Sequence, residues 1–216
     1  GDRKDIFMSK IRIERMMLGA LMTNCYLVIN EESDEVIVID PADYAERIIS
    51  KVNDMKKTVK AILLTHGHYD HMGAVAQMKE LTGADVYVHE CEQQLLMDPQ
   101  MNMSGMFGEP VSLKADVRLK DGQELTLAGC QIRVLHTPGH TRGSASYYLE
   151  ECSALLSGDT LFCESVGRSD LPTGSMSALV RSCREKLLVL PGDTAVYPGH
   201  GPETTIAHEA KYNPFL

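Results

Sequence analysis

The chain has 216 residues, 44% of them hydrophobic, which is enough to bury a core in one large domain or two small ones. Its 21 Lys and Arg and 30 Asp and Glu leave a formal charge of −9, which disfavours nucleic acid as a partner. The longest apolar runs have the length of strands, and residues 1–17 lack the apolar core of a signal peptide. We therefore expect no membrane association, and we assign no function to the first few residues.

The first half of the chain alternates strand-like and helix-like patterns. Two apolar runs flank an acidic turn, which indicates a β-hairpin, and later segments repeat apolar residues at helical spacing. Gly83 is expected to end the second of these helices. In chain order the patterns predict strands over 23–30 and 35–40, a helix over 46–55, a strand over 60–64, a helix over 72–84 and a strand over 85–89.

The second half is mostly of the β type. An irregular segment over 97–116 contains Gly, Pro and four Met, and it is expected to be loop-like. No linker or repeat divides the chain, so we predict a single domain over residues 1–216, of the α/β (α+β) class. The predicted elements are strands over 123–127, 130–136, 144–150 and 153–159, a helix over 175–190 and a strand over 194–198.

The six cysteines stand singly, and none belongs to a C-x-x-C pair. Cysteines in this arrangement are typical of reduced thiols, and most of them are expected to be small core residues. We therefore expect a cytoplasmic protein.

Four apolar runs each lead into a short loop with potential metal ligands. Ligands of open α/β sheets bind beyond the carboxyl ends of the strands, so four such loops can meet in one crevice. The loops are THGHYDH at 65–71, HTPGH at 136–140, SGDT at 157–160 and PGHG at 198–201.

The first loop has a spacing that suits more than one metal ion. His66 and His68 are one residue apart, so both rings can project to the same side of an extended loop. Asp70 and His71 then point toward a neighbouring position. Imidazole and carboxylate are ligands of zinc, iron or manganese, and this geometry favours two ions over one.

Longer motifs extend around these loops and continue toward the end of the chain. They are THGHYDHMG, HTPGHTRGS, LLSGDTLF, GRSDLP, YPGHGPETT and NPF. With them nearly the whole chain resembles the metallo-β-lactamase-fold hydrolases, and more closely their glyoxalase II group. The resemblance implies a four-layer αββα sandwich with a dinuclear metal site at one edge.

The resemblance also implies a ligand set for two divalent ions, zinc in the first place and otherwise iron or manganese. The implied ligands are His66, His68 and His140 for one ion, Asp70, His71 and His200 for the other, and Asp159 as a bridge between them. The implied catalytic residues are Asp70 and Asp159, with Asp70 holding a hydroxide that the two ions share. No G-x-S-x-G elbow or activated cysteine offers a different nucleophile.

Other polar residues are expected to support this site. Pro138 and Gly139 prevent a helix that would aim His136 at the same ion as His140, so His136 is expected to orient the loop by a hydrogen bond. Asp40 is expected to serve loop structure and not to be a ligand. Isolated His89 and His208 are expected to be structural or surface residues. Hydrogen bonds to the ligands are expected from Thr65, Thr141 and Thr160.

Substrate contacts leave alternatives open. The chain ends soon after the last ligand loop, so the C-terminal helical, glutathione-binding domain of longer glyoxalase II enzymes is not expected. Arg168 stands where those enzymes have a lysine, and it pairs either with a substrate carboxylate or with Asp170. The apolar residues of the irregular segment either fill the core or form a wall for an apolar acyl group; they are Met103, Met106 and Phe107.

Three functions remain under consideration. The first is hydrolysis of a small-molecule thioester of the S-lactoylglutathione type, because a thiolate leaves without a dedicated general acid. The second is a mononuclear-iron persulfide dioxygenase, a family that shares HxHxDH, although YPGHGP favours the hydrolase. The third is a non-catalytic, metal-dependent interaction module, which the complete set of seven ligands disfavours. The sequence leaves the physiological metal and the oligomeric state undetermined.

Overall fold

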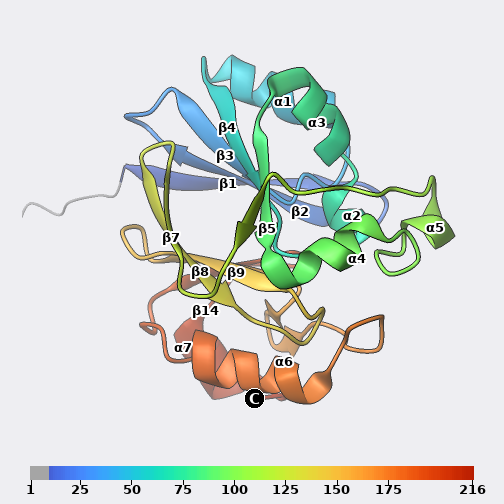
Figure 1. Ribbon diagram of the computed structural model, residues 1–216. Helices are drawn as coiled ribbons and strands as arrows, with labels where there is room; N and C mark the ends of the chain where they lie inside the picture. The colour runs from blue at the N-terminus through green and yellow to red at the C-terminus, as the bar shows by residue number, and fades with distance from the viewer. Residues whose placement is uncertain (1–9) are drawn as a thin grey trace, which may run out of the picture.

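Two six-stranded sheets form the centre of the molecule in the computed structural model, which describes residues 10–216 (Figure 1). The first few residues, to which no function is assigned, lie outside the described residues. Helices cover the outer face of each sheet, and the two inner faces pack against each other. The expected four-layer αββα sandwich is therefore confirmed.

The first sheet has the order β1-β2-β3-β4-β5-β6. Its hairpin of β2 and β3 was predicted, and β3 to β6 then pair in parallel. The strand β1 was not predicted, although the alternation of apolar and charged residues at its start is typical of a strand with one buried face; it pairs antiparallel with β2 along its whole length. The strands are Ile11–Leu18 (β1), Thr23–Asn30 (β2), Glu35–Ile39 (β3), Thr58–Leu63 (β4), Asp85–His89 (β5) and Val117–Leu119 (β6).

The second sheet has the order β14-β13-β10-β9-β8-β7, and β11 and β12 form a small hairpin beside it. Parallel pairing of β10 with β13 sets Gly158 opposite Pro198, so the ligand loops after these strands start side by side. The strands are Glu124–Leu127 (β7), Cys130–His136 (β8), Ala145–Leu149 (β9), Ala154–Gly158 (β10), Leu161–Phe162 (β11), Ser165–Val166 (β12), Ala195–Pro198 (β13) and Thr204–Thr205 (β14).

Helices α1 and α3 cover the first sheet, and α6 and α7 cover the second (Figure 1). The helix predicted over 175–190 is α6 continued by a π-helical turn, and the irregular segment contains only the short α5. No helix within residues 10–216 is long and apolar enough to cross a membrane. The helices are Ala45–Asp54 (α1), Tyr69–Met72 (α2), Val75–Thr82 (α3), Gln93–Met97 (α4), Ser104–Phe107 (α5), Met176–Ser182 (α6) and Ile206–Tyr212 (α7).

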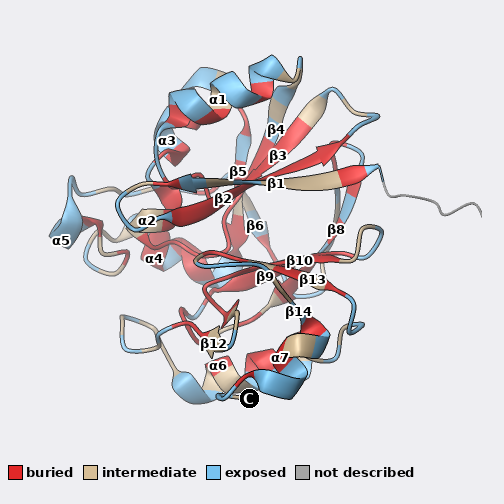
Figure 2. Cartoon of the chain, turned by 180° about the vertical axis from the view of Figure 1, so that it is seen from behind, coloured by how far each residue is buried: buried red, intermediate tan, exposed pale blue. Residues whose placement is uncertain are grey.

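The core consists of one apolar layer between the sheets and one beneath each helical face (Figure 2). The strand β2 is buried along its whole length, with Leu27 toward the helices and Tyr26 toward the second sheet. All six cysteines are free thiols, but only Cys25, Cys130 and Cys183 are buried, so the expectation of core cysteines holds for half of them.

Candidate metal centre

The structure brings all seven predicted ligands together at one edge of the sandwich. The first sheet supplies His66 and His68 from the loop after β4, and Asp70 and His71 from the short helix α2 (Figure 1). The second sheet supplies the other three from the loops after β8, β10 and β13, namely His140, Asp159 and His200. Their potential donor atoms fall into two groups: His66, His68 and His140 in one, and Asp70, His71, Asp159 and His200 in the other, each within 4.8 Å.

The three-histidine group is buried. The Nδ1 atom of His68 lies 3.0 Å from Nε2 of His140, without a carboxylate between them. Burial and the neighbouring imidazoles lower the pKa of His66 well below its usual range and that of His68 to about 3. Neutral imidazoles keep a lone pair at physiological pH, which a metal ligand requires.

The second group mixes carboxylates with imidazoles. Nε2 of His200 lies 3.1 Å from Oδ2 of Asp70, and Nε2 of His71 lies 3.2 Å from Oδ1 of Asp159. The other oxygen of Asp159 lies 3.4 Å from Nε2 of His140 and 3.5 Å from Nε2 of His200. Asp159 therefore contacts both groups.

Several buried donor atoms in the centre lack a hydrogen-bond partner. One is Nε2 of His66. Two others are Nε2 of His71 and Oδ1 of Asp159, which lie 3.2 Å apart but without the geometry of a hydrogen bond. Each buried polar atom without a partner lowers the stability of the fold by about 1–3 kcal/mol, so a cluster of such atoms without a ligand is unfavourable. Cations coordinated by these atoms remove that cost, and imidazole with carboxylate is a donor set for zinc, iron or manganese. The residues therefore fit a metal centre.

The remaining ring nitrogen of three ligands is held by the protein. Nδ1 of His71 donates to Asp40 at 2.8 Å, and Nδ1 of His140 donates to the carbonyl oxygen of Arg168 at 2.7 Å. Nδ1 of His66 lies 3.1 Å from the Thr65 hydroxyl, which donates to Asp40 at 2.6 Å. These bonds leave each Nε2 lone pair pointing into the centre. Asp40 and Thr65 thus have the supporting roles that the sequence predicts.

Thr141 and Thr160 do not hydrogen-bond to the ligands. The Thr141 hydroxyl donates to Glu92, and the Thr160 hydroxyl lies 3.4 Å from that of Thr137. The expectation for these two residues was wrong, because the Thr141 hydroxyl is directed to Glu92 and Ser144 and the Thr160 hydroxyl to Thr137, and not to a ligand ring as in Thr65. Glu92 itself was missed by the sequence reasoning, since nothing in its neighbourhood marks it.

The other histidines lie outside the centre. His136 donates through Nε2 to the carbonyl oxygen of Arg142 at 2.8 Å, which orients the loop as expected. Its ring stacks on His89 with centroids 3.9 Å apart, so His89 is structural but not isolated. Nε2 of His208 lies 3.6 Å from a Glu164 carboxylate on the surface.

A cavity of about 620 Å³ opens onto the metal ligands. Arg168 lines it, and its guanidinium also pairs with Asp170 through bonds of 2.6 and 2.9 Å. Met106 does not line the cavity and is 72% exposed. The other side chains along its wall are mostly apolar: Leu21, Tyr69, Met103, Phe107, Phe162 and Leu171.

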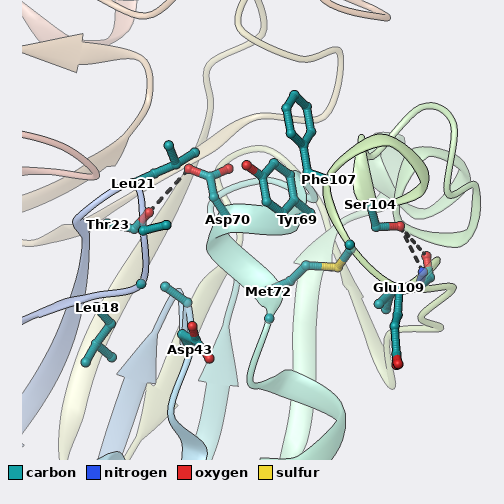
Figure 3. A pocket seen from close by; sticks show the side chains of 16 residues that line it. Leu18, Leu21, Thr23, Asp43, Tyr69, Asp70, Met72, Ser104, Phe107 and Glu109 are labelled. Atoms are coloured by element: carbon teal, nitrogen blue, oxygen red, sulfur yellow. Dashed lines mark hydrogen bonds between the residues drawn. The ribbon is translucent and has the colours of Figure 1, made fainter.

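A second groove, of about 450 Å³, adjoins this cavity (Figure 3). The two share Leu21, Tyr69, Asp70 and Phe107, and the rings of Tyr69 and Phe107 stack with centroids 5.1 Å apart between them. The residues that line the groove include the carboxylates Asp43 and Glu109 but no lysine or arginine.

A four-layer sandwich with His and Asp clusters at its edge defines a metallo-hydrolase fold class. The sequence profile of the Metallo-beta-lactamase superfamily matches residues 18–200, and the chain belongs to this superfamily. It is 40% identical over 204 residues to "Probable metallo-hydrolase YqgX" of Bacillus subtilis, covering 94% of this chain and 96% of that protein. It is 36% identical over 212 residues to "Hydroxyacylglutathione hydrolase GloC" of Haemophilus influenzae, covering 95% and 98%.

Solved structures with the same fold differ in their described chemistry. BLEG-1 B3 metallo-beta-lactamase has a TM-score of 0.90 at 40% identity, covering 95% of this chain and 99% of that one. TTHA1623 in a di-iron-bound form has a TM-score of 0.83 at 40% sequence identity, and the match covers 94% of this chain and 100% of that one. ETHE1 from Myxococcus xanthus has a TM-score of 0.78 at 29% sequence identity, and the match covers 94% of this chain and 83% of that one. Because TTHA1623 is described as di-iron-bound, the identity of the metal that the His and Asp ligands of this chain hold is open.

Proposed function

We propose that this protein is a dinuclear metallo-hydrolase that cleaves thioesters of small hydroxyacyl groups, with zinc as its metal. The observation that carries the proposal is that two groups of donor atoms adjoin each other and share Asp159. The similarity to a hydroxyacylglutathione hydrolase supports the reaction type. Six free thiols support a cytoplasmic location.

Divalent cations in such a site act as Lewis acids toward a carbonyl oxygen and make water more acidic. Asp70 is placed to orient the attacking water, because its Oδ2 is already aligned by the Thr23 hydroxyl at 3.3 Å and by His200. The proton of that water passes to this carboxylate. Apart from the ligands, the Tyr69 phenol is the one side chain in the described part of the cavity wall that could act as a general acid. A thiolate leaving group does not require one, because it departs without protonation.

The thiol carrier is proposed to contribute little binding energy. Arg168 is the only lysine or arginine that lines either cavity, and Asp170 already neutralises it. The two carboxylates of glutathione would meet Asp43 and Glu109 without compensating cations. We therefore expect a high KM and loose thiol specificity, and a strict requirement for glutathione with tight saturation would contradict this part of the proposal.

A persulfide dioxygenase is the second candidate, favoured by the similarity to ETHE1. That reaction needs a single iron, whereas His200 here lies beside Asp70 and Asp159 and completes a second group of donors. This position of His200 favours the hydrolase.

One preparation can separate these functions. We would measure metal content by mass spectrometry, cleavage of lactoyl thioesters of glutathione and of N-acetylcysteamine, oxygen uptake with glutathione persulfide, and hydrolysis of a β-lactam. Two metal equivalents with thioester cleavage and no oxygen uptake are expected. One iron with oxygen uptake, or β-lactam cleavage without thioester cleavage, would overturn the proposal.

A further inference from the structure

A carboxylate outside the ligand set lies between the two loops that carry His66, His68 and His140. Glu92 follows β5 in a short 3₁₀ turn and is fully buried, at 0% exposure. One of its oxygens accepts hydrogen bonds from the Gly67 amide at 2.9 Å and from the Thr141 hydroxyl at 2.6 Å. The other accepts from the Gly143 amide at 3.2 Å. A single side chain therefore joins the loop after β4 to the loop after β8.

The contact of the second loop with Glu92 is tight. A Cβ atom placed on Gly143 would lie 2.3 Å from the backbone nitrogen of Glu92, closer than any real contact. Only glycine allows this approach, so the distance from the second loop to Glu92 is narrowly defined.

His68 depends on this arrangement more than His66, His71 and His140 do. The second ring nitrogens of His66, His71 and His140 are bonded to protein groups, but Nε2 of His68 has no hydrogen-bond partner. Its position is set by the backbone on either side. On one side the Gly67 amide donates to Glu92, and on the other the Tyr69 amide donates to the Asn102 carbonyl at 2.9 Å.

We infer that Glu92 is a positioning residue of the metal centre, which sets the separation of His68 from His140 by bonding to both of their loops. Loss of its bonds lets the two loops move apart, so the three-histidine group binds its ion less tightly. Outer partners of ligands commonly contribute about 10–100-fold to metal affinity, and we expect about tenfold here because Glu92 acts through the backbone. The inference concerns metal binding and does not depend on which reaction the centre performs.

The chain contains a matched control. Glu209 in α7 is also at 0% exposure, and its carboxylate also accepts three hydrogen bonds, from Glu164, Asn213 and Thr204. It lies in the helical layer over the second sheet and contacts no metal ligand. Replacement of Glu209 therefore measures how much a buried, hydrogen-bonded glutamate contributes to stability, separately from any effect on metal binding.

The test compares Glu92→Gln and Thr141→Val with Glu209→Gln. In Glu92→Gln the side-chain NH2 group replaces the oxygen that accepts from the Gly143 backbone N–H, so two donors face each other and that hydrogen bond is lost. Thr141→Val removes the hydroxyl that donates to the carboxylate and keeps nearly the same side-chain size. Each full-length protein is loaded with Co²⁺ against a competing chelator, and affinity, the visible absorption spectrum and the melting temperature are recorded.

We expect one of the bound ions to be held about tenfold more weakly in Glu92→Gln, with a changed cobalt spectrum and a smaller effect in Thr141→Val. Glu209→Gln is expected to melt lower and to bind cobalt like the wild type. Wild-type affinity and spectrum in both loop variants would overturn the inference, as would an equal loss of affinity in Glu209→Gln. If Glu92→Gln does not fold, Thr141→Val against Glu209→Gln decides.

Discussion

Among single residues, Asp159 connects the two halves of the centre. Burial opposes its ionisation, but His71, His200 and His140 outweigh this and hold the pKa of the carboxyl well below its usual range. A carboxylate that stays ionised beside both donor groups can bind cations at either side. A Cβ atom on Gly199 would lie 2.3 Å from its Oδ1, so the neighbouring loop also needs glycine to approach it.

Asp159→Ala is expected to remove about one metal equivalent and to reduce turnover by about 100-fold or more, because the remaining ligands lose their shared anion. Metal content and thioester turnover of the same sample measure this. Asp193→Ala, which removes an exposed carboxylate, should change neither quantity. Full metal content and full activity in Asp159→Ala would contradict a shared ligand.

Glu92 also gives the protein a pH-dependent stability. Burial raises the pKa of Glu92 from 4.5 to about 7, although three hydrogen bonds oppose the shift. The folded state then binds the proton more tightly than the unfolded state, so this stabilisation is present below pH 4.5 and is lost as the pH rises through 7. The shift corresponds to about 3 kcal/mol.

We therefore expect the free energy of unfolding of the wild type, minus that of Glu92→Gln, to fall by about 3 kcal/mol from pH 4.5 to pH 8. The wild type loses this stability because only it carries the titrating carboxyl. Urea unfolding at a series of pH values measures it, and the use of a difference cancels the titration of other groups. Parallel curves for the two proteins would show that Glu92 keeps its ordinary pKa.

At the scale of elements, the segment around α5 and the β1–β2 turn form the apolar wall above the ligands. Met103 and Phe107 line the cavity, and Leu21 lines it from the turn. Phe107 stacks on Tyr69, which stands between the ligands His68 and Asp70. The segment thus lies beside the metal centre. Under the proposed function it would contact the acyl group of the substrate, and the extent of that contact would depend on the length of the acyl chain.

Met103→Ser and Phe107→Ala are expected to lower kcat/KM for long acyl chains about tenfold relative to acetyl, because apolar contact is lost only for the longer groups. The measurement is kcat/KM across a series of acyl thioesters. Met106→Ser should leave the ranking unchanged, since Met106 is exposed and outside the cavity. If every substrate loses activity equally and the protein melts several degrees lower, the two residues serve packing and not selectivity.

At the scale of the whole molecule, the metal centre joins the two halves of the sandwich. The first sheet contributes ligands through β4 and α2, and the second through β8, β10 and β13. An ion coordinated from both sheets binds the folded chain far better than the unfolded one, so it stabilises the arrangement of the sheets as well as the loops.

Removal of the metal by a chelator is expected to lower the melting temperature by about 10 °C. An ion present at about 1,000 times its dissociation constant contributes about 4 kcal/mol, and about 2–4 °C is lost per kcal/mol in a domain of this size. Calorimetry before and after chelation measures the change, and added Zn²⁺ should reverse it. An unchanged melting temperature would contradict the prediction, because it would mean that no ion bound between the two sheets stabilises the folded chain.

The sequence alone predicted the features that depend on neighbouring residues. The hairpin of β2 and β3, the helix that ends at Gly83 and the strands before each ligand loop follow from local periodicity and turn residues. The αββα class and the seven candidate ligands were implied by the family resemblance that the motifs carry, and each motif can be recognised within a single stretch of sequence.

Tertiary structure decided what depends on residues far apart in the chain. His89 acquires a partner only because β5 and β8 bring its ring to His136. Met103 and Met106 are three residues apart, yet only the first lines the cavity. Glu92 lies 25 residues from Gly67 and 49 from Thr141, so its role arises from long-range packing that no local pattern encodes.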